Sequence, residues 1–291
     1  MKGLILNNAY YETPTTRYQG KRLASELGKL GVSVDIKKNN YFGAAIKDGS
    51  LENAATGYDF CVYLDKDKYL SYAMEKCGIR LFNRHDAIRA CDDKAMTFLR
   101  LAGSGIAIPK TLPGLLCYTP DAEISADTYA VLQRELGFPM IAKQCYGSLG
   151  KFVYKIDNLE ELQKISEEMK CVPHLFQQFI AESAGRDVRV ICIGGKAVAA
   201  MKRTAKNDFR SNIELGGTGT PYEIDGDLCL LTERVANFLR LDFCGIDVLF
   251  GKDGYLLCEV NSNAFFGGIE GVTGMNIAGI YAKHIVDSMN A

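Results

Sequence analysis

The chain has 291 residues, of which 47% are hydrophobic and 24% are charged, and its formal net charge is −1. This composition is typical of a globular protein, and the near-zero charge excludes sequence-independent binding to nucleic acids or to anionic membranes. No apolar run approaches the roughly 20 residues that a membrane-spanning helix needs.

The first part of the chain alternates between strand and helix patterns. Its opening apolar segment becomes polar too early for a secretory signal and is typical of a first strand. The alternation predicts a small parallel sheet with helices on its faces. Its strands are Gly3–Asn7, Val32–Ile36, Tyr58–Leu64 and Ile79–Phe82, and its helices are one around Leu23, Leu27 and Leu30 and one over Tyr69–Lys76.

Parallel sheets bind ligands at the carboxyl ends of their strands, and the segment Asn8–Tyr18 follows the first strand. We expect it to be a loop, rich in Tyr and Thr. It is either part of a substrate site, with Arg17 as its cation, or an ordinary solvated loop. Residues 84–104, which include Lys94, are predicted to form one helix.

A compact α+β unit is predicted next, with helices over Ala126–Leu136 and Asn158–Lys170 and strands over Pro139–Gln144, Phe152–Ile156 and His174–Ile180. Lys143 ends an apolar strand and precedes the turn Gly147-Ser148-Leu149-Gly150, whose backbone could approach a phosphate closely. Such turns are also common between ordinary strands, and this one is not a Walker A loop.

Three further features of this region have both a functional and an ordinary interpretation. The strand end at Gln177–Ile180 could pair with an adenine edge or be a simple edge strand. The basic segment Lys202–Asn212 could bind phosphates or be solvated. Asp187 and Arg189 alternate on one strand, Asp187–Ile193, and could pair with each other or contact a ligand.

The strongest signal lies near the carboxyl end, in a predicted β-hairpin. With a three-residue loop, Lys252–Gly254, Gly251 would face Tyr255 and Asp247 would lie opposite Glu259, with Asn261 on the same face. Two carboxylates and an amide oxygen on one face favour a hard cation such as Mg²⁺. The alternative, a polar strand facing solvent, is weakened because these residues interrupt apolar strands.

The ten cysteines are scattered along the chain and form no Cys-x-x-Cys pair, which argues against a zinc site. Most lie in apolar stretches, including Cys258, and we interpret them as reduced core residues of a cytoplasmic protein.

These motifs together resemble the ATP-grasp superfamily and, within it, the RimK-like α-L-glutamate ligases. The resemblance runs from about Asn83 to the carboxyl end. The matching segments are Asn83–Lys94, Phe138–Lys143, Phe179–Glu182, Gly185–Arg189, Ala199–Arg203, Asp208–Asn212, Gly245–Asp247, Glu259–Ser262, Gly268–Glu270 and Asn276–Gly279.

The resemblance implies an α/β (α+β) ATP-grasp fold in three parts: an N-terminal Rossmann-like domain over residues 1–90, a central lid over 91–182 and a C-terminal domain over 183–291. It also implies ATP and two Mg²⁺ ions as cofactors, with Mn²⁺ as a substitute, and a homo-oligomer. Asp247, Glu259 and Asn261 would bind the ions.

The resemblance further assigns a role to each matching side chain. Arg203 and Arg210 would be catalytic. The nucleotide would be bound by Lys94, Lys143, Gly147, Ser148, Gln178, Phe179, Asp187, Arg210, Ser211 and Asn212. The implied reaction joins a small-molecule or peptide carboxylate to an amino-acid amine, with glutamate as the amine, and involves neither nucleic acid nor membrane.

The chain departs from the family pattern after Asn261, where Asn263-Ala264-Phe265-Phe266 replaces a frequent Ser-Pro-Gly. Asn263, in this segment, and Arg17, in the segment after the first strand, are the candidate substrate residues. The departure leaves open another ATP-grasp ligase, of the D-alanine–D-alanine or lysine-biosynthesis type. A nucleotide-binding regulatory module without turnover is the alternative from a different class.

Overall fold

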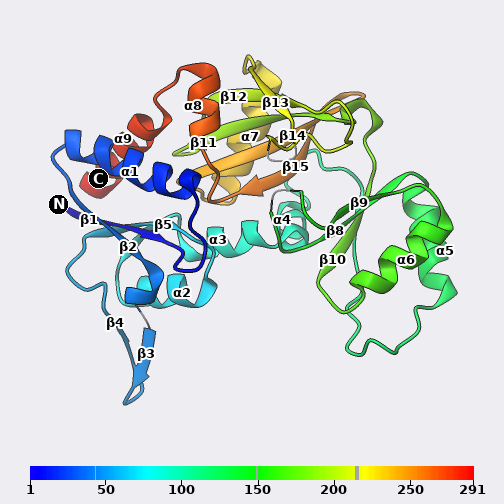
Figure 1. Ribbon diagram of the computed structural model, residues 1–291, viewed down its shortest axis with the longest axis horizontal. Helices are drawn as coiled ribbons and strands as arrows, with labels where there is room; N and C mark the ends of the chain where they lie inside the picture. Colours follow the sequence, from blue (N-terminus) through cyan, green and yellow to red (C-terminus); the bar gives the residue numbers. More distant parts are fainter. Residues whose placement is uncertain (43, 149, 214–215) are drawn as a thin grey trace.

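Three main β-sheets, each built from one stretch of the chain, organise the protein (Figure 1). The computed structural model describes residues 1–42, 44–148, 150–213 and 216–291. Leu149 of the predicted glycine turn lies outside these residues. No helix among them is long and apolar enough to cross a membrane.

The N-terminal sheet is parallel, as the sequence predicted, in the order β2-β1-β5-β6. Apolar residues of β1 are buried on both sides of the sheet, as expected for a parallel sheet covered by helices. The elements of this region are β1 (Lys2–Asn7), α1 (Pro14–Lys29), β2 (Ser33–Lys38), a 3₁₀ turn (Asn39–Tyr41), β5 (Phe60–Leu64), α2 (Lys68–Lys76) and β6 (Arg80–Phe82).

The predicted loop Asn8–Tyr18 is wrong in its second half, because α1 already begins at Pro14. The Thr13 side chain accepts a hydrogen bond from the Thr16 backbone N–H, and the Thr16 hydroxyl accepts one from the Thr13 N–H. Such a capping box, followed by Pro in the first turn, starts a helix. Arg17 therefore lies on a helix.

The predicted helix over residues 84–104 is two helices, α3 (His85–Asp92) and α4 (Lys94–Leu101). Asp93 lies between them in an extended conformation, and its carboxylate accepts a hydrogen bond from the Met96 N–H. An N-cap of this kind starts a new helix, so Lys94 becomes the first residue of α4.

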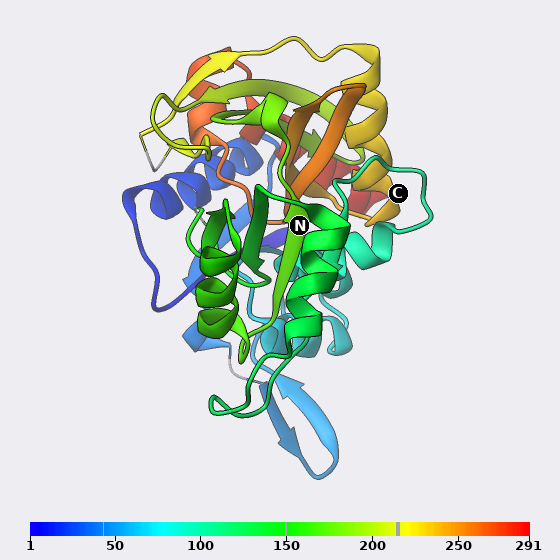
Figure 2. The ribbon, with the colours of Figure 1, turned by 90° about the vertical axis from the view of Figure 1, so that its right-hand side faces the viewer.

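A further hairpin, β3 (Ala44–Lys47) and β4 (Ser50–Asn53), projects from the molecule (Figures 1 and 2).

The middle unit stands to one side of the rest of the molecule (Figure 1). Its antiparallel sheet has the order β7-β10-β8-β9, and two helices contribute to its core. The elements are β7 (Thr111–Pro113), α5 (Ala126–Leu136), β8 (Met140–Gln144), β9 (Val153–Ile156), α6 (Leu159–Met169) and β10 (His174–Gln178), followed by a 3₁₀ turn (Ala181–Ser183).

The C-terminal sheet is antiparallel, in the order β13-β12-β11-β14-β15. One of its faces packs against α7, and the other shares a core with α1, α9 and the N-terminal sheet. The elements are β11 (Arg186–Ile193), β12 (Lys196–Thr204), β13 (Thr218–Pro221), α7 (Gly226–Phe238), β14 (Phe243–Gly251), β15 (Gly254–Asn261), α8 (Gly267–Thr273) and α9 (Ile277–Asn290).

The hairpin β14–β15 reaches the predicted pairing by a different route. Its turn contains only Lys252 and Asp253, so Gly251 faces Gly254 and not Tyr255. A β-bulge then makes Cys258 the extra residue of β15. Because the bulge offsets the shorter turn, Asp247 still lies opposite Glu259.

Candidate nucleotide and acceptor cavities

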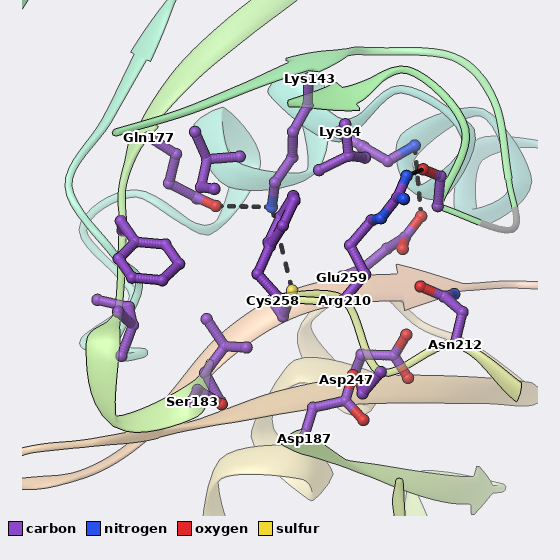
Figure 3. A pocket seen from close by; sticks show the side chains of 18 of the residues that line it. Lys94, Lys143, Gln177, Ser183, Asp187, Arg210, Asn212, Asp247, Cys258 and Glu259 are labelled. Atoms are coloured by element: carbon purple, nitrogen blue, oxygen red, sulfur yellow. Dashed lines mark hydrogen bonds and ion pairs between the residues drawn. The ribbon is translucent and has the colours of Figure 1, made fainter. Parts of the chain in front are cut away.

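A cavity lies between the middle unit and the C-terminal sheet (Figure 3). We call it the nucleotide cavity. Its walls include nearly every residue for which the sequence predicted a role in binding or turnover, contributed by both sides. These are Lys94, Lys143, Gly147, Ser148, Gln178, Phe179, Asp187, Arg203, Arg210, Ser211, Asn212, Asp247 and Glu259.

Lys143 projects into the nucleotide cavity from β8 and is almost fully buried. Its ammonium donates a hydrogen bond to the Gln177 Oε1 atom at 2.7 Å, and Gln177 in turn donates to the Thr111 hydroxyl at 2.7 Å. A buried cation needs such a polar partner. The side chain that orients Lys143 is thus Gln177, the neighbour of the predicted Gln178.

Lys94 reaches the other end of the cavity from the start of α4. Its Nζ atom donates to the Gly147 carbonyl at 2.9 Å and lies 3.3 Å from a carboxylate oxygen of Glu259. The Lys94 N–H also donates to the Cys145 carbonyl at 3.1 Å. Lys94 therefore connects the glycine turn of the middle unit to the C-terminal sheet (Figure 3).

Two arginines and two aspartates alternate across strands β11, β12 and β14 and form a network of neutral total charge. Arg203 makes a fork of hydrogen bonds to Asp187, one of 2.7 Å, and its Nη2 atom lies 3.0 Å from Asp247. Arg189 makes a second fork to Asp247, with bonds of 2.7 and 2.8 Å. Asp187 and Arg189 thus do not pair with each other.

Burial alone would raise the pKa of Asp247, but the charges of Arg189 and Arg203 outweigh it and lower this pKa to about 2. Burial likewise opposes the charge of Arg203, whereas Asp247 and Asp187 raise its pKa above the ordinary arginine value. Both groups are therefore charged at neutral pH, in a site from which water is largely excluded.

Arg210 closes one side of the nucleotide cavity. Its guanidinium bonds the carboxylate of Asp208, with a shortest distance of 2.7 Å, and donates to the Gly150 carbonyl at 2.8 Å. Because Gly150 belongs to the glycine turn, Arg210 links this turn to the segment that follows β12. Ser211, which is buried, and Asn212 continue the same wall.

The donor set predicted for Mg²⁺ fits a hard cation. Asp247 and Glu259 are paired across β14 and β15, and Asn261 is two residues further along, opposite Gly245. All three supply oxygen ligands. Among the described residues, no group of three His, Cys, Asp or Glu side chains could hold a metal, so an ion here needs the Asn261 oxygen as well as the two carboxylates.

A second cavity, which we call the acceptor cavity, adjoins the nucleotide cavity and shares Ser148, Asn212 and Glu259 with it. It lies between the carboxyl ends of β1 and β5 and the end of β15. The Asn263 Oδ1 atom is buried and has no hydrogen-bond partner among the described residues. The lining of the acceptor cavity also includes Asn8, Tyr11, Lys66, Arg189, Asn261 and Asn263.

Arg17 does not line the acceptor cavity. It lines a neighbouring basic cavity with Lys21 and Lys38, and its guanidinium lies 3.2 Å from the carboxylate of Glu12. The two cavities share Asn7, Asn8, Tyr11 and Thr16. Of the two candidate substrate residues, Asn263 therefore lines the acceptor cavity together with the predicted metal ligands Glu259 and Asn261, whereas Arg17 lines the neighbouring basic cavity.

Several lining residues had no role in the sequence-based assignment. Cys258 was interpreted as a core residue, but its sulfur lies 4.0 Å from the Lys143 ammonium at the wall of the nucleotide cavity. Its orientation follows from the bulge, which leaves no signature in the sequence. Lys151 and Arg186 also line this cavity.

The fold is that of an ATP-grasp protein. The family model of the RimK-like ATP-grasp domain matches residues 91–286, and the chain belongs to this family. In fold it is similar to a RimK domain ATP-grasp protein from Sphaerobacter thermophilus, with a TM-score of 0.76, 18% identity and coverage of 98% of this chain and 99% of that one. The predicted ATP-grasp fold is confirmed.

A D-alanine–D-alanine ligase from Bacillus anthracis has the same fold, with a TM-score of 0.74, 14% identity and coverage of 99% of this chain and 97% of that one. Among curated proteins, the chain is 34% identical over 228 residues to β-citrylglutamate synthase B of Danio rerio, covering 77% of this chain and 55% of the relative.

The chain is also 34% identical over 227 residues to human N-acetylaspartylglutamate synthase A, covering 77% of this chain and 56% of the relative. A probable α-L-glutamate ligase of Maridesulfovibrio salexigens is 32% identical over 214 residues, with 72% and 68% covered. The chain thus spans little more than half the length of the first two relatives.

Proposed function

We propose that the protein is an ATP- and Mg²⁺-dependent ligase that joins the amine of glutamate to a carboxylate of an acidic acceptor. The observation that carries this proposal is the contact between the two cavities at Glu259. One cavity holds cations suited to phosphates, and the other holds amide groups suited to a polar acid. Glu259 lines both of them.

The charge of each side chain determines the part of the nucleotide or the ion that it would bind. Lys94, Lys143 and Arg210 would neutralise the phosphates of ATP, and Gln178 and Phe179 would flank the adenine. When bound at Asp247, Glu259 and Asn261, Mg²⁺ would supply further neutralisation and alignment of the phosphates. Phosphoryl transfer needs such neutralisation and no protein nucleophile.

The acceptor carboxylate would take the terminal phosphoryl group of ATP, and the glutamate amine would then displace phosphate to form the amide. Arg203 is suited to stabilise the negative charge that develops in both steps, because it is buried, permanently charged and held in a fixed direction by Asp187.

Three relatives carry names that contain glutamate, which supports glutamate as the amine. Two of these names contain citryl or N-acetylaspartyl, so citrate and N-acetylaspartate are the first acids to test. A peptide carboxylate is a further candidate, since a solved ATP-grasp ligase of the same fold is described with a precursor peptide.

The test is ADP release from ATP and Mg²⁺ with glutamate and each acid in turn, with mass spectrometry of the product. We expect ADP to be released only when acid and amine are both present. ADP release that is independent of glutamate, with no amide formed, would contradict the proposal.

A further inference from the structure

Arg189 lies at the boundary between the two cavities. Its side chain lines the acceptor cavity, whereas the carboxylate that it binds, Asp247, lines the nucleotide cavity. The fork between them has bonds of 2.7 and 2.8 Å. Among the described residues, Asp247 is the only partner recorded for the Arg189 guanidinium.

The two arginines that contact Asp247 differ in how firmly they are held. Arg203 is bound by both Asp187 and Asp247, and its side chain is 3% exposed. Arg189 is bound by Asp247 alone, and its side chain is 17% exposed. If one of them must leave Asp247, Arg189 loses fewer partners and is already in contact with a polar cavity.

A divalent cation at Asp247 creates that requirement. The two positive charges of the cation would lie beside the guanidinium groups of Arg189 and Arg203, which already balance the charge of Asp247. Repulsion between like charges is strong where water is excluded. The predicted metal site and the Arg189 fork therefore compete for one carboxylate.

The acceptor cavity offers Arg189 another place. Gly245 lies beside the arginine and has no side chain; a Cβ atom there would be 3.8 Å from the Arg189 Cδ atom and 2.6 Å from the Ala264 Cβ atom. Asn263 offers an unpaired, buried amide oxygen in the same cavity. Lys66, the lysine of this cavity, is already paired with Asp92 at 3.1 Å.

We propose that Arg189 exchanges one carboxylate for another: it neutralises Asp247 before the metal binds, then turns into the acceptor cavity and holds a carboxylate of the acceptor. This inference rests on the proposed ligase function. It makes metal binding and acceptor binding mutually favourable, because each favours the same position of Arg189. Arg189 thereby becomes a binding residue for the acid.

The experiment compares the wild-type protein with Arg189→Met, Arg189→Lys and a control, Arg134→Met, which removes an exposed arginine of α5 paired with Glu135. The first measurement is the affinity for Mn²⁺ by electron paramagnetic resonance, with a non-hydrolysable ATP analogue and without any acid. The competing cation is absent in Arg189→Met, so we expect Mn²⁺ to bind at least about threefold more tightly, with Arg189→Lys intermediate and the control unchanged.

The second measurement is the half-saturating concentration of the acid that supports turnover. We expect Arg189→Met to raise it about tenfold or more, while the requirement for ATP changes less than threefold. The two effects have opposite signs, which a general loss of stability in the variant would not produce. Melting temperatures monitor folding, and Arg189→Lys keeps the charge should the methionine variant be unstable.

An unchanged or weaker Mn²⁺ affinity in both Arg189 variants would overturn the exchange even if the ligase turns over normally. Tighter Mn²⁺ binding with an unchanged acid requirement would overturn the second part of the proposal, that Arg189 holds a carboxylate of the acceptor. If no acid supports ADP release, the proposed function itself fails, and the Mn²⁺ titration still decides whether Arg189 competes with the metal.

Discussion

Asn83 and Phe243 exchange hydrogen bonds in both directions across the junction of the N-terminal and C-terminal sheets. The Asn83 amide donates to the Phe243 carbonyl at 2.6 Å, and the Phe243 N–H donates to the Asn83 Oδ1 atom at 3.0 Å. Asn83 also donates to the Ser262 carbonyl at 2.8 Å and accepts from the Asp242 N–H at 2.7 Å. One buried carboxamide thus fixes the start of β14 and the end of β15, the strand that carries the predicted metal ligands Glu259 and Asn261.

Asn83→Ala should therefore destabilise the protein strongly. It leaves buried backbone groups without partners, each at a cost of about 1–3 kcal/mol, so we expect the free energy of unfolding to fall by about 3 kcal/mol or more. Urea denaturation measures the change. Asn237→Ala, at an exposed asparagine of α7 that donates a hydrogen bond to the Gly195 carbonyl, is the control and should cost less than half as much.

Glu259→Ala tests the metal assignment. The variant loses a carboxylate that lines both cavities, and we expect turnover at saturating ATP to fall by about a thousandfold while circular dichroism stays the same. The control is Glu233→Ala, which removes a surface pair with Lys196. Activity close to wild type in Glu259→Ala, or in excess chelator, would refute the magnesium site.

Substitutions of Lys143 and Arg203 should change different kinetic parameters. Lys143→Ala removes a ground-state contact, so the half-saturating ATP concentration should rise about tenfold or more with a smaller effect on the maximal rate. Arg203→Lys keeps the charge but loses the fork to Asp187, so the maximal rate should fall by about a hundredfold or more. Steady-state kinetics separate the two; a raised ATP requirement alone in both variants would contradict the role of Arg203.

Arg17→Ala tests whether the acceptor extends into the basic cavity. We expect the half-saturating concentration of the acid to rise while that of ATP stays within about threefold, since a bidentate guanidinium is suited to a carboxylate. Glu12→Gln is the matched variant, because it releases Arg17 from its pair and should lower the acid requirement. If neither variant changes the kinetics, Arg17 is a surface residue.

The stability of the protein should depend on pH through Glu26, a buried carboxylate of α1. Hydrogen bonds from Lys29 and then Arg22 lower its pKa to about 2, against 4.5 in its ordinary state. A lowered carboxylate pKa adds stability that is complete above about pH 4.5 and is lost as the pH falls towards 2. Between pH 5.5 and pH 3, the wild type should lose on the order of 1–2 kcal/mol more than Glu26→Gln in urea denaturation.

Asp287→Asn, in an exposed pair with Lys283 on the last helix, controls for the loss of one charge. Equal slopes of the unfolding free energy with pH in wild type and Glu26→Gln would show that this carboxylate is not the origin of the acid sensitivity.

Much of the fold could be predicted from the sequence because its patterns are local and periodic. The parallel strands β1, β2, β5 and β6 coincide with apolar runs, although their order in the sheet was not predicted. Two of the errors occurred where a single side chain overrides the pattern. Thr13 starts a helix inside an expected loop, and Asp93 divides an expected helix into two.

The site was predictable to the extent that its residues lie in recognisable motifs. Lys94, Lys143, Arg210 and Glu259 were all assigned from the sequence and line one cavity. The contacts between them were not predictable, because they join distant segments. The pairing of Arg189 with Asp247 depends on the register of β11 against β14, which no pattern within either strand specifies.

The bulge at Cys258 has an evolutionary consequence. The bulge adds one residue to β15 and thereby compensates for a turn of only Lys252 and Asp253. A longer turn without a bulge would therefore give β14 and β15 the same pairing register at Asp247. A homologue that gains one turn residue can keep the residues equivalent to Asp247 and Glu259 opposite each other by losing the residue at position 258. Such compensating insertions and deletions would appear in an alignment as two unrelated gaps flanking four ordinary positions, although geometrically they are one event.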